Sequence, residues 1–153
     1  MKKNIGFLNF GHWTPSPHSA VRTASDTLLQ TIELAVAAEE LGVDGAYVRV
    51  HHFARQLASP YPLLAAMAAR TSRIELGTGV IDMRYENPLR MAEDAGAADL
   101  ISGGRLQLGI SRGSPEQVID GFRYFGFEPK DGDHAAMARE HTGELLEVLK
   151  GEG

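Results

Sequence analysis

Short apolar runs alternate with longer amphipathic segments along the whole chain. The apolar runs predict β-strands over residues 5–10, 45–50, 74–80 and 106–111, and the amphipathic segments predict helices over 25–41, 60–69, 88–101 and 135–149. Consecutive strands start about 30 to 40 residues apart, the spacing of βαβ units. Such alternation is typical of a parallel sheet. We therefore predict an α/β fold, in one domain over residues 1–153, with four parallel strands and intervening helices.

Residues with capping chemistry mark the ends of the predicted helices. Ser25 is the predicted N-cap of the first helix, and Gly42 ends it. Asn87-Pro88 opens the third helix and Ser102-Gly103-Gly104 closes it. Ser114-Pro115 with Gln117 predicts a further short helix after the fourth strand. The buried face of the first helix is predicted to consist of large apolar residues: Leu28, Leu29, Ile32, Val36 and Leu41.

Two architectures fit this pattern, an open doubly wound sheet and the first half of a (β/α)₈ barrel. In both of them, functional sites form at the carboxyl ends of the strands. The residues after the four strands are, in order, Asn9, Gly11, His12 and Trp13; His51, His52 and Phe53; Thr78, Gly79, Asp82 and Arg84; and Ser111, Arg112, Gly113 and Ser114. Polar, small and aromatic groups on one rim suit a planar cofactor with an anionic tail.

The pair His51-His52 has the most evident chemistry. Because side chains alternate across a strand, at most one ring points toward the site while the other is diverted. A histidine there serves as a general acid or base near neutral pH. The alternative is a structural histidine, hydrogen-bonded between helix and strand. Adjacent histidines lack the spacing of metal ligands, so no metal site is predicted.

Arg112 follows the fourth strand and leads into a predicted helix start. A guanidinium group and free backbone N–H groups together suit a phosphate. The alternative is an ion pair between Arg112 and an acid such as Glu93 or Asp94. The segment Gly77-Thr78-Gly79 places two glycines inside a strand, which indicates a close ligand approach or a local distortion.

Composition and charge exclude several classes of function. With 43% hydrophobic and 23% charged residues, the chain has an ordinary globular composition. A net charge of −5 with scattered lysines and arginines argues against nucleic-acid binding. The absence of cysteine excludes disulfides and a thiolate nucleophile. No apolar run is long enough to span a membrane, and we expect a cytoplasmic location.

Five segments, taken in order, resemble the amino-terminal half of the bacterial luciferase-like monooxygenase family (LLM class flavin-dependent oxidoreductases). They are residues 48–53, 74–81, 87–94, 100–113 and 122–126. The turn Ser102-Gly103-Gly104-Arg105 and the strand after it are the most specific part. The resemblance implies the first half of a TIM (β/α)₈-type barrel.

The resemblance also implies an activity. The expected enzyme uses reduced FMN and O₂ to oxygenate a small organic substrate, and a separate flavin reductase supplies the FMN. We also expect a homo-oligomer. His51 matches the family's catalytic histidine, with His52 beside it. Arg112, next to Gly113, matches the arginine that holds the flavin phosphate. The segment Thr78-Gly79-Val80 is expected to line the flavin, with a cis peptide at Gly79-Val80. Some relatives use the deazaflavin F420 instead.

Two departures from the family pattern stand out. Val50 occupies the place where the family commonly has a glutamate before the two histidines, and family members are about twice this length. A half-barrel has exposed edges at its first and fourth strands. Three explanations stay open: a truncated piece, two associated copies, or completion by another chain. The alternative to an enzyme is thus a non-catalytic half-barrel fragment.

Overall fold

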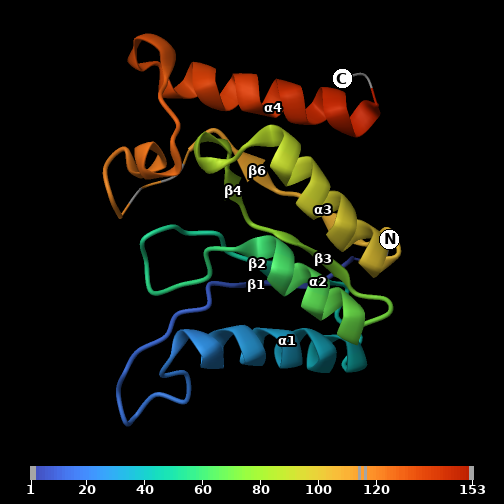
Figure 1. Cartoon of the computed structure of the whole chain (residues 1–153). Coiled ribbons are helices and arrows are strands. Elements are labelled where there is room, and N and C mark those ends of the chain that lie inside the picture. Colours follow the sequence, from blue (N-terminus) through green and yellow to red (C-terminus); the bar gives the residue numbers. More distant parts are fainter. Residues whose placement is uncertain (1–2, 114, 116, 152–153) are drawn as a thin grey trace.

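The computed structural model describes residues 3–113, 115 and 117–151. Four parallel strands form one sheet in chain order, as predicted: β1 (Gly6–Asn9), β2 (Gly45–Val48), β3 (Glu75–Thr78) and β5 (Leu106–Gln107). The helices between and after them are α1 (Ala24–Glu40), α2 (Pro60–Arg70), α3 (Pro88–Ser102) and α4 (His134–Lys150). Figure 1 shows these four helices side by side in chain order.

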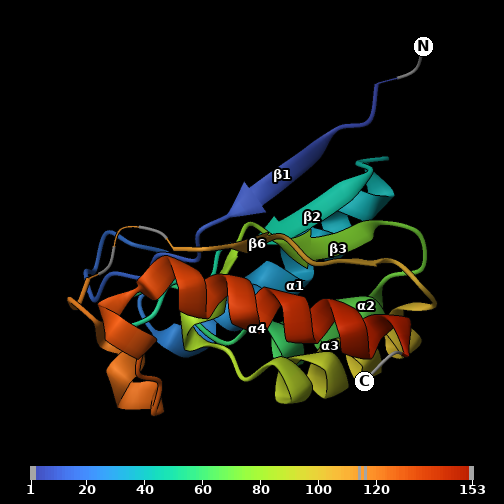
Figure 2. The same ribbon diagram turned by 90° about the horizontal axis from the view of Figure 1, so that it is seen from above.

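The molecule has a sheet layer and a helix layer. Viewed from above, the strands lie together on one side and the helices on the other (Figure 2). Neighbouring helices contact one another along the row. The helix-facing side of the sheet is therefore covered, whereas its opposite side carries no helix among the described residues. No helix in the described ranges is long and apolar enough to cross a membrane.

Two of the strands are each followed by a second, short strand. The third continues beyond β3 as β4 (Ile81–Asp82), and the fourth continues beyond β5 as β6 (Ile110–Ser111); β4 and β6 pair in parallel. The break has a side-chain cause. The Thr78 hydroxyl donates to the Gly109 carbonyl at 2.9 Å and accepts from the Gly109 N–H at 3.0 Å. A side chain thus replaces the backbone ladder here, so the prediction of one uninterrupted strand over 106–111 was wrong, whereas the strand predicted over 74–80 is present as β3 and ends at Thr78.

Helix α1 packs mainly through small residues; of the large apolar residues predicted to be buried, Ile32 packs against the core, but the leucines are exposed. Its buried residues are Thr27, Thr31, Ala35 and Ala38. Leu29 and Leu41 are 60% and 84% exposed. Small side chains let the helix approach the sheet closely, and the Thr31 hydroxyl accepts a hydrogen bond from the Asn9 amide at 2.8 Å. The N-cap is Thr23, which forms a capping box with Asp26, and not Ser25.

The other predicted helix ends are largely confirmed. Asn87 caps α3, with Pro88 at its first position, and Gly103 ends it in the left-handed conformation. The short helix predicted from Ser114 begins outside the described residues. The next regular elements are the 3₁₀ helices η2 (Gly121–Phe125) and η3 (Lys130–Gly132). A third 3₁₀ turn, η1 (Met83–Tyr85), joins β4 to α3.

The buried residues form separate clusters that follow one another along the row of helices. One buried cluster joins α1 and α2 to β2 and β3, with Leu64, Met67 and Leu76 at its centre. A second lies under α3 and α4 and includes Met91 and Leu145. Both clusters lie between helices and sheet. The carboxyl ends of the strands are left free to bear polar groups.

Candidate functional site

The His51 ring lies in a polar chain at the carboxyl end of β2. Its Nδ1 lies 3.3 Å from Gln56 Oε1, and its Nε2 lies 3.1 Å from the Pro115 carbonyl oxygen. Gln56 Nε2 in turn lies 2.7 Å from His12 Nε2, on the segment after β1. A single ring proton on His51 serves only one of its two acceptors at a time. The arrangement therefore links the ends of β1 and β2 to the segment after β6 through hydrogen-bonding groups, of which the two histidines can carry a proton.

His52 points into an aromatic cluster. Its ring stacks on Tyr85 with centroids 4.4 Å apart, and Phe125 meets it edge-on at 5.0 Å. Burial lowers the pKa of the His52 imidazole below its ordinary value of 6.5, and the adjacent His51 acts in the same direction. Its Nε2 is buried without a hydrogen-bond partner among the described residues. The two histidines thus diverge, as the alternation of side chains requires.

A buried ion pair lies at the end of β4. Arg84 Nη2 lies 2.6 Å from Asp82 Oδ2, and Arg84 Nε lies 3.0 Å from Asp82 Oδ1. Gly113 covers the guanidinium with a φ of 147°, and a Cβ there would lie 3.0 Å from Arg84 Cζ. Only glycine fits this position without displacing the ion pair. A cavity of about 10 Å³ is lined by Asp82, Tyr85 and the two histidines, and it has room for about one water molecule.

The segment from Thr78 to Val80 crosses from β3 to β4. The peptide bond between Gly79 and Val80 is cis, as the family resemblance predicts. Thr78 is buried, and its hydroxyl is fully engaged by Gly109. The Gly79 N–H donates to the Val48 carbonyl at 2.9 Å. The backbone here is firmly held, and Gly79 contributes no side chain.

Arg112 is exposed beyond the end of β6. Within the described ranges it forms no hydrogen bond or ion pair, and Glu93 is paired with Arg90 at 3.2 Å instead. The Glu93 alternative is therefore wrong. Ser114, proposed as a helix N-cap beside it, lies outside the described residues.

The structure brings the predicted residues of β2, β3 and β6 to one end of the sheet, together with groups that the sequence did not point to. Gln56 lies on the loop after the histidines, and Tyr85 and Phe125 form the walls around His52. The aromatic residues near 122–126 belonged to the matching segments, but nothing in their spacing indicated contact with His52.

The sequence of this chain is similar to those of known proteins. Residues 8–152 match the family described as luciferase-like monooxygenase. The chain is 31% identical over 93% of its length to the 4-hydroxyprotoasukamycin monooxygenase of Streptomyces nodosus subsp. asukaensis, covering 36% of that protein. It is 34% identical over 79% of its length to the oxygenase component of the flavin-dependent trigonelline monooxygenase of Acinetobacter baylyi, covering 32% of it.

Solved structures support the same architecture. The oxygenating constituent of 3,6-diketocamphane monooxygenase from Pseudomonas putida, solved with FMN, superposes with a TM-score of 0.83 at 23% identity. The match covers 98% of this chain and 40% of that one. An F420-dependent secondary alcohol dehydrogenase superposes with a TM-score of 0.67 at 21% identity, over 97% of this chain and 42% of that one. At these identities the likeness shows the fold alone, which is part of a TIM barrel.

The chain therefore spans about two fifths or less of the length of these relatives. Within that span, the match is continuous from β1 to the end of α4. The sequence match and the barrel-like sheet agree with each other. The chain belongs to the luciferase-like monooxygenase family.

Proposed function

We propose that this chain supplies one half of a flavin site, at which reduced FMN and O₂ oxygenate a small organic substrate. The observation behind the proposal is the convergence of His51, the segment from Thr78 to Val80 and the uncompensated Arg112 on one end of a parallel sheet. Family membership supports it. The relative from Acinetobacter baylyi is an oxygenase component, which supports a separate reductase as the source of reduced flavin.

The residues present fit FMN. A phosphate requires a cation with free donors, and Arg112 has a guanidinium group that no carboxylate of the described chain neutralises. A flat ring system requires a surface without projecting groups. The segment Thr78-Gly79-Val80 provides a small residue on each side of a glycine.

Each residue then has a defined part. Arg112 binds the phosphate, the backbone from Thr78 to Val80 supports the ring, and His51 holds a proton beside the reacting atoms, with Gln56 orienting its Nδ1. When bound, reduced FMN supplies the electrons that activate O₂. His52 lies beside His51, and its ring packs against Tyr85 and Phe125.

Binding of reduced FMN to the purified chain tests the proposal without requiring a substrate. In an anaerobic titration followed by absorbance and fluorescence, we expect saturable binding in the micromolar range. Arg112→Ala should weaken it at least tenfold, because each charge-assisted phosphate contact contributes about 1.5 to 3 kcal/mol. Arg139→Ala, an exposed arginine on α4, is the matched control and should leave binding unchanged. Equal binding by both variants would refute the role of Arg112.

The same titration decides among the alternatives. Binding of F420 in place of FMN would indicate an oxidoreductase that needs no O₂. Absence of binding by either flavin would indicate that this part of the chain alone is a non-catalytic half-barrel. Where FMN binds, His51→Ala should slow oxygen-dependent turnover of the flavin while preserving its affinity. A variant with unchanged turnover would show that His51 is structural.

A further inference from the structure

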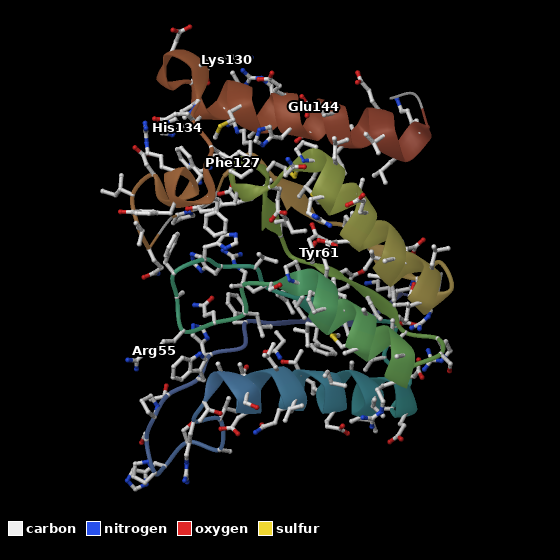
Figure 3. The ribbon with its side chains drawn as sticks, viewed as in Figure 1. Arg55, Tyr61, Phe127, Lys130, His134 and Glu144 are labelled. Atoms are coloured by element: carbon white, nitrogen blue, oxygen red, sulfur yellow. The ribbon has the colours of Figure 1, made fainter. Side chains whose placement is uncertain are left out.

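An open cleft of about 460 Å³ lies outside the flavin region, between the starts of α2 and α3. The side chains that matter for its chemistry come from several elements: His52 after β2, Tyr61 of α2, Tyr85 of η1 and Glu86 after it, and Phe125 and Phe127 before α4. Figure 3 labels Tyr61 and Phe127, which come from two distant parts of the chain. Its volume is in the usual range for small-molecule sites, about 300 to 1,000 Å³.

Four aromatic side chains, Tyr61, Tyr85, Phe125 and Phe127, contribute to the wall of this cleft. Tyr85 and Phe125 meet edge-on with centroids 5.3 Å apart. Phe125 is 48% exposed, so part of its ring remains accessible from the cleft. Ring faces have a negative electrostatic potential, and several rings around one space attract a cation whose hydration is weak.

The one carboxylate in the wall, Glu86, lacks a counter-ion. It is half-buried, and no described residue forms a hydrogen bond or ion pair with its side chain. Arg90 also lines the cleft, but its guanidinium is directed to Glu93 at 3.2 Å and is 71% exposed. The Tyr61 hydroxyl is buried in the same wall without a partner among the described residues. When Glu86 is ionised, no described cationic side chain therefore neutralises its carboxylate, and a bound cation would do so.

The charges that face Glu86 make the local potential negative. Asp94 on α3 and Asp82 at the end of β4 both disfavour a further negative charge on it. His52 lines the same cleft, and burial lowers the pKa of its imidazole, so its ring is neutral at pH 7 and above. Glu86 and Asp94 act on Tyr61 in the same sense. Burial first, and then these two aspartates, raise the pKa of Glu86 to about 7. In the absence of another cation, a proton therefore neutralises this group near neutral pH.

We propose that this cleft binds a small organic cation of the quaternary ammonium type, surrounded by Tyr61, Tyr85, Phe125 and Phe127 and neutralised by Glu86. The aromatic walls accommodate the methyl groups, and the carboxylate supplies the opposite charge. A simple metal ion is disfavoured, since the described part of the chain has no cluster of three or more ligating side chains. The cleft adjoins the proposed flavin region through His52, but the proposal does not require flavin to bind.

The competition between a cation and a proton gives the site a characteristic pH dependence. The cation binds the ionised carboxylate, so affinity should rise as the pH increases through 7 and fall below it. Between pH 8 and pH 6 the ionised fraction of a group with a pKa of about 7 falls about tenfold. Binding should weaken by the same factor, and binding at pH 7 should release protons.

The experiment compares choline with 3,3-dimethylbutan-1-ol, which has the same shape with carbon in place of the charged nitrogen. Each is titrated into the ¹⁵N-labelled chain at constant ionic strength and followed by NMR. We expect saturable choline binding in the millimolar range, with shifts confined to the cleft, and at least tenfold weaker binding of the neutral analogue. No saturation by choline, or equal binding of the two probes, would overturn the proposal.

Variants distinguish choline binding in the cleft from a general effect of the protein's net charge on choline affinity. Glu86→Gln should weaken choline binding at least tenfold and abolish its dependence on pH. Glu40→Gln makes the same charge change at the exposed end of α1 and should have no effect. Phe125→Leu, at a half-exposed position that tolerates substitution, should also weaken binding and keeps the test valid if Glu86→Gln does not fold. Choline binding that is unchanged in both cleft variants would locate it elsewhere and refute the proposal.

Discussion

At the scale of single residues, the carboxylate of Glu39 accepts several hydrogen bonds from the backbone. It receives the backbone N–H groups of Ser72, Arg73 and Ile74 at 2.6 to 3.1 Å, where the chain enters β3. Burial acts to raise the pKa of Glu39, but these backbone donors prevail and lower it to about 2. The charge at the end of α1 therefore fixes the start of a central strand, at the end of the sheet opposite to the candidate site.

Replacing Glu39 by glutamine should destabilise the fold by about 1 to 3 kcal/mol at pH 7, the usual cost of losing charge-assisted hydrogen bonds. A depressed carboxyl pKa stabilises the folded state above the ordinary value of 4.5, and this contribution disappears as the pH falls toward 2. Urea unfolding of Glu39→Gln and the parent chain should therefore converge between pH 4.5 and pH 2. A difference that does not depend on pH would contradict this account, and Glu40→Gln is the adjacent control.

The residues of the candidate site could be predicted in part from the sequence. His51, His52 and Arg112 lie at strand ends, a position that topology alone singles out. Gln56, Glu39 and Glu86 were not predicted, because their roles arise from contacts between segments far apart in sequence, or from burial. Glu86 looks like an ordinary exposed acid in the sequence. Its lack of a counter-ion becomes evident only where α2, α3 and η2 meet.

At the scale of elements, Arg105 joins two helix ends to a strand. Its guanidinium donates to the carbonyls of Ser102, Ile74, Ala68 and Thr71 and to the Thr71 hydroxyl, at 2.6 to 3.1 Å. The last turns of α2 and α3 leave carbonyl groups without helical partners. Arg105 donates to carbonyl groups at the ends of both helices and thereby fixes the spacing of the two helices. This explains why the turn before β5 ends in an arginine.

Arg105→Ala should cost at least about 3 kcal/mol of unfolding free energy, because several part-buried carbonyls lose their donors together. Arg105→Lys should recover little of this loss, since a lysine lacks the planar fork that reaches several acceptors at once. Chemical denaturation measures both effects. Arg139→Ala, whose guanidinium is exposed and 4.0 Å from Asp133, should change stability by less than about 0.5 kcal/mol. Comparable losses at the two arginines would disprove the special role of Arg105.

The elements themselves were predictable, but the side that each one buries was less so. Strand order and helix positions follow from the alternation of apolar and amphipathic segments. The buried face of α1 does not, because its close approach to the sheet selects Thr27, Thr31 and Ala35 over the larger leucines. The division of the fourth strand likewise depends on the Thr78 hydroxyl, which the pattern of hydrophobic residues does not encode.

At the scale of the whole molecule, the sheet has two open edges. Within the described residues β1 pairs only with β2, and β5 pairs only with β3. Leu8 and Phe10 lie at the β1 edge and are 40% and 44% exposed. Unpaired backbone groups beside exposed apolar side chains are a template for pairing with another chain. The fold therefore favours association along its edges.

We expect this chain to associate reversibly through its open edges, and sedimentation velocity over a range of concentrations measures this directly. Leu8→Lys places a charge at the β1 edge and should shift the equilibrium toward the monomer, because bringing an unpaired ammonium group into an apolar contact is costly. Leu29→Lys makes the same change on the outer surface of α1, where Leu29 is 60% exposed, and should have no such effect. If Leu29→Lys alone dissociates the assembly, the contact surface is the helix row. If the parent chain sediments as a monomer at every concentration, its edges are protected by their own geometry.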